Sequence, residues 1–312
     1  MGLSIITPHY NDFSGITKIY DYLMSQSSEN WQWIIVDDCS SVDVKNNFTV
    51  FFENNTSSKI KIVFNESKTN ASSCRNLGVE YAIHDNLVFL DSDDKITSEF
   101  VKNRLITIED FAVFLNFNLF NSAGEVKPFS TVKNNFLDHF LKANFVWQTT
   151  AVLWNTSFFK NLGKFNTSLS LLEDIEISIR ALLSGNNFEI LNNSDVDFYY
   201  YAKPIDIKQR TVEKVTASVN QLITNLTTDF ELNKIQLKKL KAYYFLSVRY
   251  LVRSGNKDDI SYVQSNLKLF LNKKCISFLQ FVLGTTLLWA YSKEMISDTI
   301  FLKINRYFFK SK

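Results

Sequence analysis

Two clusters of acidic residues each follow a short apolar run in the first third of the chain. Asp37-Asp38 comes after residues 33–36, and Asp91-Ser92-Asp93-Asp94 comes after residues 87–90. If both runs are strands of an open α/β sheet, these acids lie in the crevice beyond the carboxyl ends of the strands, where such sheets bind ligands. Carboxylates there bind either a donor-rich ligand or a metal ion that carries phosphates. These acids are therefore the first candidates for a functional site.

The second cluster has the spacing expected of a cation site. Magnesium and manganese sites on nucleotides use one or two carboxylates together with the phosphates, which suits Asp91 and Asp93. The alternative is a solvated turn, because Asp and Ser are also common turn residues. Phosphatases of the haloacid dehalogenase type also begin with a strand and Asp-x-Asp, but they continue with Thr or Val where this chain has Asp94. That class is therefore disfavoured.

Three further positions suit the recognition of a nucleotide. Asp38 could accept a hydrogen bond from a base NH group, and the ring of Tyr10, just after Pro8, could stack on a base. A helix cap at Asp37 and a core or turn tyrosine are the structural alternatives. Arg75, near the start of a predicted helix, is poorly placed for the helix dipole, which favours a ligand or carboxylate partner over a solvated face.

A third acidic segment lies much later in the chain. Ser170 and Glu173 match a capping box, in which Glu173 bonds back to the backbone at the helix start. Asp174 is not needed for such a cap. A carboxylate near a helix N-terminus stays ionised, and Asp174 could take a proton from a sugar hydroxyl.

Hydrophobic periodicity predicts a strand-helix alternation that places these residues. Such alternation indicates an α/β fold with a parallel sheet and helices on both faces. The expected strands are 3–8, 33–37, 60–64, 87–90, 111–120, 150–154, 187–191 and 196–201. The expected helices are 15–26, 42–53, 72–83, 97–108, 135–142, 156–162 and 173–184, with a loop or short hairpin at 121–134 and only helices from about 212.

Composition indicates a folded protein with an electrostatically distinct tail. The chain has 312 residues, 46% of them hydrophobic, and a formal charge of +2, which argues against a general nucleic-acid binder. From residue 267 onward, eight Lys and Arg residues face two acids. The three cysteines are few and scattered, and the N-terminus does not have the pattern of a signal peptide, which favours the reducing cytoplasm.

The tail contains an uncharged segment at residues 275–292, with lysines on both sides. Its length is at the lower limit for a spanning helix, and its Gln, Thr and Ser residues weaken that interpretation. A helix in a bundle or dimer interface and a helix lying on an anionic membrane surface are the other two interpretations.

Taken together, the motifs resemble those of the family 2 glycosyltransferases in order and spacing, over roughly residues 1–205. The resemblance is carried by residues 4–11, 36–41, 73–78, 89–94 and 173–174. It implies a GT-A fold, a nucleotide-sugar donor that is usually a UDP-sugar, Mn²⁺ or Mg²⁺, and inversion at the anomeric carbon. It also implies a catalytic domain at 1–210, with a nucleotide-binding half at about 1–95 and an acceptor-binding half at about 96–210, followed by a helical region at 211–312.

The resemblance assigns roles to individual residues. Pro8, Tyr10 and Asp38 resemble the uridine contacts, and Arg75 lies near the nucleotide or braces its loop. The remaining assignments are Asp91 on the ribose or donor sugar, Ser92 among the residues that bind the nucleotide-sugar, Asp93 with Asp91 on the metal, Asp174 as the base and Glu173 towards the acceptor. His9 and Cys39 depart from the family pattern, in which glycine is common at the second position. A basic loop that covers the diphosphate in the family would correspond to Lys203 or Arg210.

The implied activity is transfer of one sugar to a glycan or lipid-linked saccharide in surface polysaccharide biosynthesis. Transfer of a single sugar is favoured because the Gln-x-x-Arg-Trp pattern of processive synthases is absent. The expected location is the cytoplasm, with residues 268–312 as the contact to the membrane surface or to a second copy. The alternatives are a non-catalytic nucleotide-sugar or glycan-binding module on the same fold and a membrane-docked assembly subunit.

Overall fold

The computed structural model describes residues 1–312 except 130–131, 133, 186, 192–194, 203–210 and 311–312. The chain divides into two compact units. The first unit comprises Met1–Val132, Trp147–Thr167 and Ser184–Lys203, and the second comprises Lys133–Val146, Ser168–Leu183 and Pro204–Lys312. Two segments from the middle of the chain thus group with the C-terminal helices. The predicted domain boundary near 210, and the predicted loop residues Lys203 and Arg210, lie outside the described residues.

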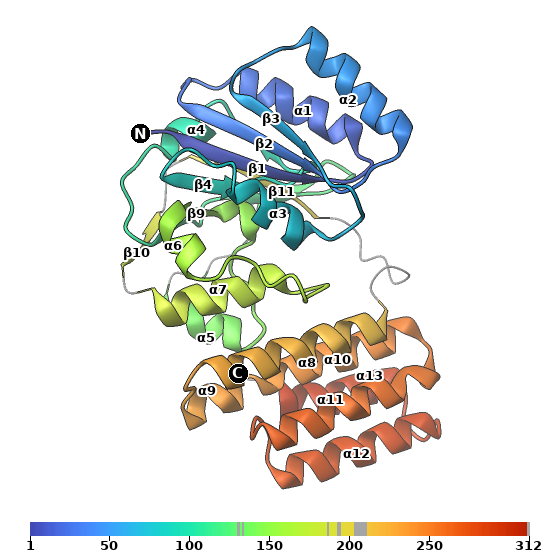
Figure 1. Ribbon diagram of the computed structural model, residues 1–312. Coiled ribbons are helices and arrows are strands. Elements are labelled where there is room, and N and C mark those ends of the chain that lie inside the picture. The colour runs from blue at the N-terminus through green and yellow to red at the C-terminus, as the bar shows by residue number, and fades with distance from the viewer. Residues whose placement is uncertain (130–131, 133, 186, 192–194, 203–210, 311–312) are drawn as a thin grey trace. The chain divides into compact units, whose positions relative to one another are not determined.

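A seven-stranded sheet forms the core of the first unit, in the order β10-β6-β9-β4-β1-β2-β3 (Figure 1). The adjacent pairs from β4 to β3 are parallel, and β9 runs antiparallel to both β4 and β6. The strands are β1 (Leu3–His9), β2 (Trp31–Asp37), β3 (Ile60–Phe64), β4 (Asn86–Phe89), β6 (Phe111–Phe114), β9 (Val152–Asn155) and β10 (Phe188–Leu191). The predicted parallel arrangement therefore holds for the N-terminal half of the sheet.

Helices cover both faces of this sheet, because side chains of successive strand residues point to opposite sides. Trp33 on β2 contacts Phe52 of α2, whereas Val36 lies on the opposite face, under α3. α3 approaches closely because Gly78 has no side chain; a Cβ there would lie 2.5 Å from Ile6 Cγ2. The helices of the unit are α1 (Phe13–Met24), α2 (Val42–Asn54), α3 (Ala71–Val79), α4 (Phe100–Asn103) and α6 (Thr156–Asn161).

A second sheet of four strands, in the order β5-β11-β7-β8, belongs to the same unit. Its strands are β5 (Lys95–Ile96), β7 (Asn118–Phe120), β8 (Val126–Pro128) and β11 (Phe198–Tyr201). Arg104, next to this sheet, is fully buried. It donates to Asp197 at 2.8 Å, and its guanidinium lies 3.5 Å from the centre of the Phe100 ring. This ion pair ties the end of α4 to the start of β11.

Three sequence-based elements are wrong in extent. The predicted strand at 111–120 is two strands, β6 and β7, in different sheets, because the chain turns at Leu115–Phe117, where the Phe117 N–H donates to the Leu115 carbonyl. The predicted helices at 97–108 and 72–83 shrink to α4 and α3. For the divided strand, pairing with different partner strands overrides the apolar pattern.

The second unit is helical in its described residues, as predicted from residue 212. Its helices are α5 (Phe136–Leu141), α7 (Glu173–Ser184), α8 (Val212–Asp229), α9 (Lys234–Lys239), α10 (Lys241–Ser254), α11 (Ile260–Asn272), α12 (Phe278–Ser292) and α13 (Asp298–Phe309). Tyr243 of α10 donates from its hydroxyl to the Phe140 carbonyl at 2.7 Å, which fixes α5 to the later helices. No helix in the described residues has both the length and the apolar character needed to cross a membrane.

Candidate active site

The predicted nucleotide residues follow three neighbouring strands. β2, β1 and β4 are adjacent and parallel, so their carboxyl ends meet at one edge of the sheet. Tyr10 follows β1, Asp38 follows β2, and Asp91 comes shortly after β4. Pro8, the next to last residue of β1, pairs in register with Val36. The fold thus brings to one edge of the sheet side chains from Pro8 to Asp91, which are 83 positions apart in the sequence.

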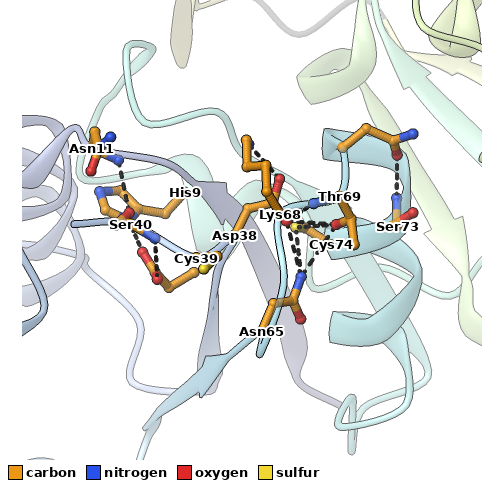
Figure 2. A network of polar contacts seen from close by, with 12 residues as sticks. His9, Asn11, Asp38, Cys39, Ser40, Asn65, Lys68, Thr69, Ser73 and Cys74 are labelled. Atoms are coloured by element: carbon orange, nitrogen blue, oxygen red, sulfur yellow. Dashed lines mark hydrogen bonds and ion pairs between the residues drawn. The ribbon is translucent and has the colours of Figure 1, made fainter. Parts of the chain in front are cut away.

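Asp38 is the centre of a dense hydrogen-bond network (Figure 2). Its Oδ1 accepts from the Thr69 N–H at 2.8 Å, the Thr69 hydroxyl at 2.6 Å and Asn65 Nδ2 at 3.1 Å, while Oδ2 accepts from Lys68 Nζ at 2.5 Å. The side chain is 4% exposed. Burial by itself raises the pKa of Asp38, but the bonds from Lys68, Thr69 and Asn65 outweigh it and lower the pKa to about 2. Asp38 is therefore an anion that holds the loop before α3.

Lys68 connects this carboxylate to the predicted stacking residue. Its ammonium group lies 3.6 Å from the centre of the Tyr10 ring, a cation–π contact, while it also donates to Asp38. The Tyr10 side chain is half exposed. Lys68 thus occupies, in this structure, a place between the two groups that the sequence assigns to the base.

Asp37, the residue before Asp38, faces the opposite side of the sheet. Its Oδ1 accepts from His9 Nδ1 at 2.8 Å, and its Oδ2 accepts from the Ser40 N–H at 3.0 Å. Because His9 Nε2 accepts from the Asp12 N–H at 3.0 Å, the proton of this buried ring is on Nδ1. Burial acts to raise the pKa of Asp37, but these hydrogen bonds keep it below its ordinary value. Asp37 fixes the turn that presents Asp38.

The turn after β2 also explains one departure from the family pattern. Cys39 has a φ of 63°, in the left-handed region that glycine adopts without strain. The backbone shape usually formed by glycine is thus retained here with a cysteine. The loop geometry survives because the Asn11 N–H donates to the Ser40 hydroxyl at 2.9 Å and the Ser41 N–H donates to Asn11 Oδ1 at 2.9 Å.

The second acidic cluster begins with an ion pair. Arg75 of α3 donates from Nη2 to Asp91 Oδ1 at 2.7 Å, with the guanidinium 5.4 Å from the centre of the Phe165 ring. The Arg75 side chain is 5% exposed and that of Asp91 29%. The sequence left open a ligand or a carboxylate as the partner of Arg75; the structure provides the carboxylate. Arg75 thereby orients Asp91 at the edge of the sheet.

Asp94 is buried beneath the loop. It accepts from the Tyr201 N–H at 3.0 Å and from the Thr150 hydroxyl at 2.8 Å, which joins the loop to β11 and to the turn before β9. Burial raises the pKa of Asp94 well above its ordinary value, and the charges of Asp91 and Asp93 act in the same direction. Asp94 therefore anchors the loop through buried hydrogen bonds, whereas the neighbouring Asp93 is half-buried at the loop surface.

A polar cavity of about 620 Å³ opens beside this loop in the first unit. Among the predicted site residues, Ser92 and Asp93 line it. Ser92 donates to Asp12 Oδ2 at 2.7 Å, and Asp12 Oδ1 in turn accepts from the Gly15 N–H at the start of α1. The other lining residues are Ser14, Gly15, Lys18, Tyr22, Asp94, Lys95, Phe120, Asn121, Ser122, Gly124, Val126, Tyr199 and Tyr201. Its size and its mixture of rings, hydroxyls and charges are those of a small-molecule site.

The described residues fit a cation that brings its own oxygen ligands. They contain no group of three or more His, Cys, Asp or Glu side chains that could hold a metal ion alone. Asp91 is engaged by Arg75 through one oxygen, and Asp93 is half-buried at the cavity. Mg²⁺ on nucleotides commonly takes one or two carboxylates plus phosphate and water oxygens. This donor set suits a cation bound together with a diphosphate.

The predicted catalytic acids lie in the second unit, at the start of α7. The capping box is wrong: α7 begins at Glu173 itself, after Leu172 with a φ of 68°, so Ser170 does not cap it, and its hydroxyl lies 3.1 Å from that of Ser218. Asp174 Oδ1 accepts from the Ile175 N–H at 2.9 Å. The third acid of this turn, Glu176, is neutralised by two bonds from Arg180, at 2.6 and 2.8 Å.

Four residues of the site were missed from the sequence. Lys68, Asn65 and Thr69 donate to Asp38, and Asp12 accepts from Ser92. Asn65 and Lys68 follow β3, the strand next to β2, and Asp12 follows β1. The strand-end rule that selected Asp38 and Asp91 therefore applies to them too, and Asp12 is also an acid near a strand end.

Comparison with known proteins agrees with this geometry. The family model described as Glycosyl transferase family 2 matches residues 4–160, half of the chain. The amylovoran biosynthesis glycosyltransferase AmsB of Erwinia amylovora is 35% identical over 109 residues, covering 35% of this chain and 36% of that protein. The UDP-Glc:alpha-D-GlcNAc-diphosphoundecaprenol beta-1,3-glucosyltransferase WfgD of Escherichia coli is 28% identical over 193 residues, covering 61% of this chain and 73% of that protein.

Solved structures confirm the predicted GT-A fold. Staphylococcus aureus TarS 1-349, crystallised with UDP-GlcNAc, has a TM-score of 0.62 at 16% identity, with 94% of this chain and 92% of that chain covered. The chain spans between 36% and 62% of the length of three of the curated relatives that it matches. The sequence motifs, the sheet and the family match lead to one conclusion: the chain belongs to glycosyltransferase family 2 and is related to enzymes of polysaccharide biosynthesis.

Proposed function

We propose that this protein is an inverting glycosyltransferase that moves one sugar from a nucleotide-sugar, a UDP-sugar by preference, to a glycan or lipid-linked saccharide. The observation that carries the proposal is the meeting of Tyr10, Asp38 and the Arg75–Asp91 pair at one edge of the sheet, with Asp93 nearby at a polar cavity. A site of this kind suits a ligand with a base, a diphosphate and a sugar. Polysaccharide assembly at the cytoplasmic face of the membrane is the setting that we propose.

The nucleoside end of the donor would lie on Pro8, Tyr10 and Asp38. In this proposal the base displaces Lys68 from the Tyr10 ring, because both would use the same aromatic surface. The Lys68 ammonium, on a long flexible side chain, is then released towards the phosphates. The low pKa of Asp38 suits this task, since an ionised carboxylate only accepts hydrogen bonds and therefore selects a base with an N–H donor.

The sugar-diphosphate end would lie at the second acidic cluster. Asp91, held by Arg75, and Ser92, held by Asp12, are oriented to contact the ribose or the donor sugar. Asp93 would be the carboxylate ligand of Mn²⁺ or Mg²⁺, with Asp91 beside it, and when bound the cation would offset the charge of the departing diphosphate. The cavity lined by Ser92 and Asp93 has room for a sugar ring.

Asp174 is the proposed general base. It lies in the first turn of α7, where the helix dipole favours a negative charge. There it would accept the proton of the acceptor hydroxyl as the new glycosidic bond forms and the bond to the diphosphate breaks. Glu173 beside it would orient the acceptor. Attack from the side opposite the leaving group gives inversion.

A donor screen tests the proposal. Nucleotide-sugars are added with and without Mn²⁺, and binding is read as an increase in melting temperature, followed by donor turnover for each one that binds. A UDP-sugar that raises the melting temperature, with turnover that disappears in Asp93→Ala and Asp174→Asn, supports the proposal. Donor binding in the wild type with no turnover on any acceptor would instead favour a non-catalytic binding module.

A further inference from the structure

One helix of the second unit presents an apolar surface that nothing in the described residues covers. α12 contains no charged residue, and it packs inward through Gly284, Leu287, Leu288 and Tyr291, which are buried. A Cβ at Gly284 would lie 2.8 Å from Leu267 of α11, so this packing is close. The opposite side of the helix is exposed.

We define the α12 face as the exposed apolar residues of that side. Phe278 is 66% exposed, Leu279 80%, Val282 45% and Trp289 54%. Leu279, Val282 and Trp289 recur at helical spacing, so they form one stripe along the helix. The other four tryptophans of the chain, Trp31, Trp33, Trp147 and Trp154, are each at most 4% exposed. Exposure of such a stripe marks an interaction surface.

Positive charge surrounds the α12 face. Lys274 and Lys293 are exposed beyond its two ends. Gln280 donates to the Phe308 carbonyl at 3.1 Å, which places the end of α13, with exposed Arg306 and Tyr307, beside the start of α12.

Both acids of the tail are engaged elsewhere. Glu294 accepts from Lys257 at 2.8 Å, and Asp298 accepts from the Tyr291 hydroxyl at 2.8 Å. The charges around the α12 face are therefore mainly positive, with exposed Glu294 paired to Lys257.

We propose that the α12 face docks on the surface of an anionic lipid bilayer. The charge pattern selects this occupant over a second copy of the chain. Antiparallel pairing of two α12 helices would bring Lys274 near Lys293 of the other copy, and parallel pairing would bring equivalent lysines together; α12 itself offers no carboxylate to compensate them. An anionic bilayer supplies both an apolar layer and negative headgroups.

The residue types fit a helix that lies in the plane of the membrane interface. Leu279 and Val282 would enter the boundary between headgroups and acyl chains, and the amphipathic Trp289 ring would sit at the headgroup level. Lys274 and Lys293 would reach the lipid headgroups. This inference is independent of the transfer reaction, because none of these residues belongs to the proposed active site.

The tryptophan distribution provides a direct test on the full chain. Vesicles of phosphatidylglycerol and phosphatidylcholine are compared with vesicles of phosphatidylcholine alone, each with and without brominated acyl chains. The anionic vesicles should bind the protein, shift its tryptophan emission to shorter wavelength and, when brominated, quench the exposed component. Trp289→Phe should keep binding in a sedimentation assay but lose the spectral shift, since the remaining tryptophans are buried.

Variants separate the charge contribution from the apolar contribution to vesicle binding. The double variant Leu279→Glu/Trp289→Glu should reduce the partition coefficient on anionic vesicles by about tenfold or more. Lys274→Gln/Lys293→Gln should produce a smaller loss that high salt reproduces in the wild type. Ile235→Glu, at an exposed isoleucine of α9 in the same unit, is the matched control and should bind as the wild type does. Circular dichroism melts check that each variant folds.

Two results would overturn the proposal. One is equal vesicle binding by the wild type and by Leu279→Glu/Trp289→Glu. The other is absence of vesicle binding together with a dimer, measured by light scattering, that the same double variant dissociates. The second result would assign the α12 face to a second copy of the chain.

Discussion

The two acidic clusters look alike in sequence but have different surroundings in the structure. At the end of β2, both acids are buried and accept several hydrogen bonds. Asp38 accepts four, from Asn65, Lys68 and Thr69. Asp37 accepts from His9 and Ser40. After β4, Asp93 and Asp94 both line a cavity, but only Asp94 is buried. Asp38 therefore anchors the neighbouring loop in addition to its proposed contact with the base, whereas Asp93, at the cavity, is a candidate metal ligand.

Asp93 gives the largest test of this contrast. Asp93→Asn should lower donor turnover about 1000-fold, roughly 4 kcal/mol of transition-state stabilisation, because it removes the carboxylate proposed for the cation that offsets the diphosphate charge. The melting temperature without ligand should change little. Turnover is measured with Mn²⁺ present. Asp85→Asn, an exposed residue just before the other end of β4, is the control and should retain activity.

Asp38 should show the reverse pattern, with a large effect on stability. Asp38→Ala leaves the donors of Lys68, Thr69 and Asn65 without their acceptor in a buried place, which should cost about 3 kcal/mol of unfolding free energy. Urea unfolding measures the loss. Asp43→Ala, at an exposed acid in the first turn of α2, should cost no more than about 0.5 kcal/mol. If the two substitutions destabilise equally, the scaffold role of Asp38 is wrong.

Acid titration sharpens the same point. Because the folded-state pKa of Asp38 is lowered from 3.8 to about 2, its contribution is fully present above pH 4 and lost as the pH falls towards 2. The amount is about 2 kcal/mol, and Asp38→Asn should remove this part of the acid dependence. The free energy of unfolding of wild type and variant is measured in urea between roughly pH 2.5 and pH 5, where the charge of Asp38 differs between the folded and unfolded states. Parallel stability curves would contradict it.

Asp94 should respond to pH with the opposite sign and the smallest effect. Its folded-state pKa is raised, so its contribution is complete below the ordinary value of 3.8 and declines as the pH rises towards the folded-state pKa. Asn is neutral at all pH values and can still accept from the Tyr201 N–H. Asp94→Asn should therefore match the wild type near pH 4 and exceed it by about 1 kcal/mol at pH 7. A variant that is less stable than the wild type at pH 7 would show that Asp94 is needed as an anion.

Much of the first unit is encoded locally. Apolar runs of strand length, the alternation of strands with helical patterns and the acids at the strand ends predicted the parallel strands and the edge where Asp38 and Asp91 meet. They also led to the family. The α7 helix was predicted with its observed bounds, Glu173–Ser184, because its apolar period is regular.

The local sequence pattern did not predict element boundaries that depend on residues distant in the chain. Residues 111–120 look like one strand, but β6 pairs with β9 and β10 whereas β7 pairs with β8 and β11, so the apolar run is divided between two sheets. Ser170 and Glu173 have capping-box spacing, which would start the helix at residue 171, but Leu172 has a left-handed backbone and α7 starts at Glu173.

The sequence by itself determined the residue types, the strand periods and the order of motifs, and these were sufficient for the fold class and the family. Only the tertiary structure decided which acid does what. Asp37 and Asp38 are neighbours in the chain, but the pleat turns one towards His9 and the other towards Lys68. Asp93 and Asp94 line the same cavity, but Asp93 is half-buried whereas Asp94 is buried and accepts from Thr150 and Tyr201. The physical reason is that burial and donors come from residues distant in sequence, and these set the charge and reach of each carboxylate.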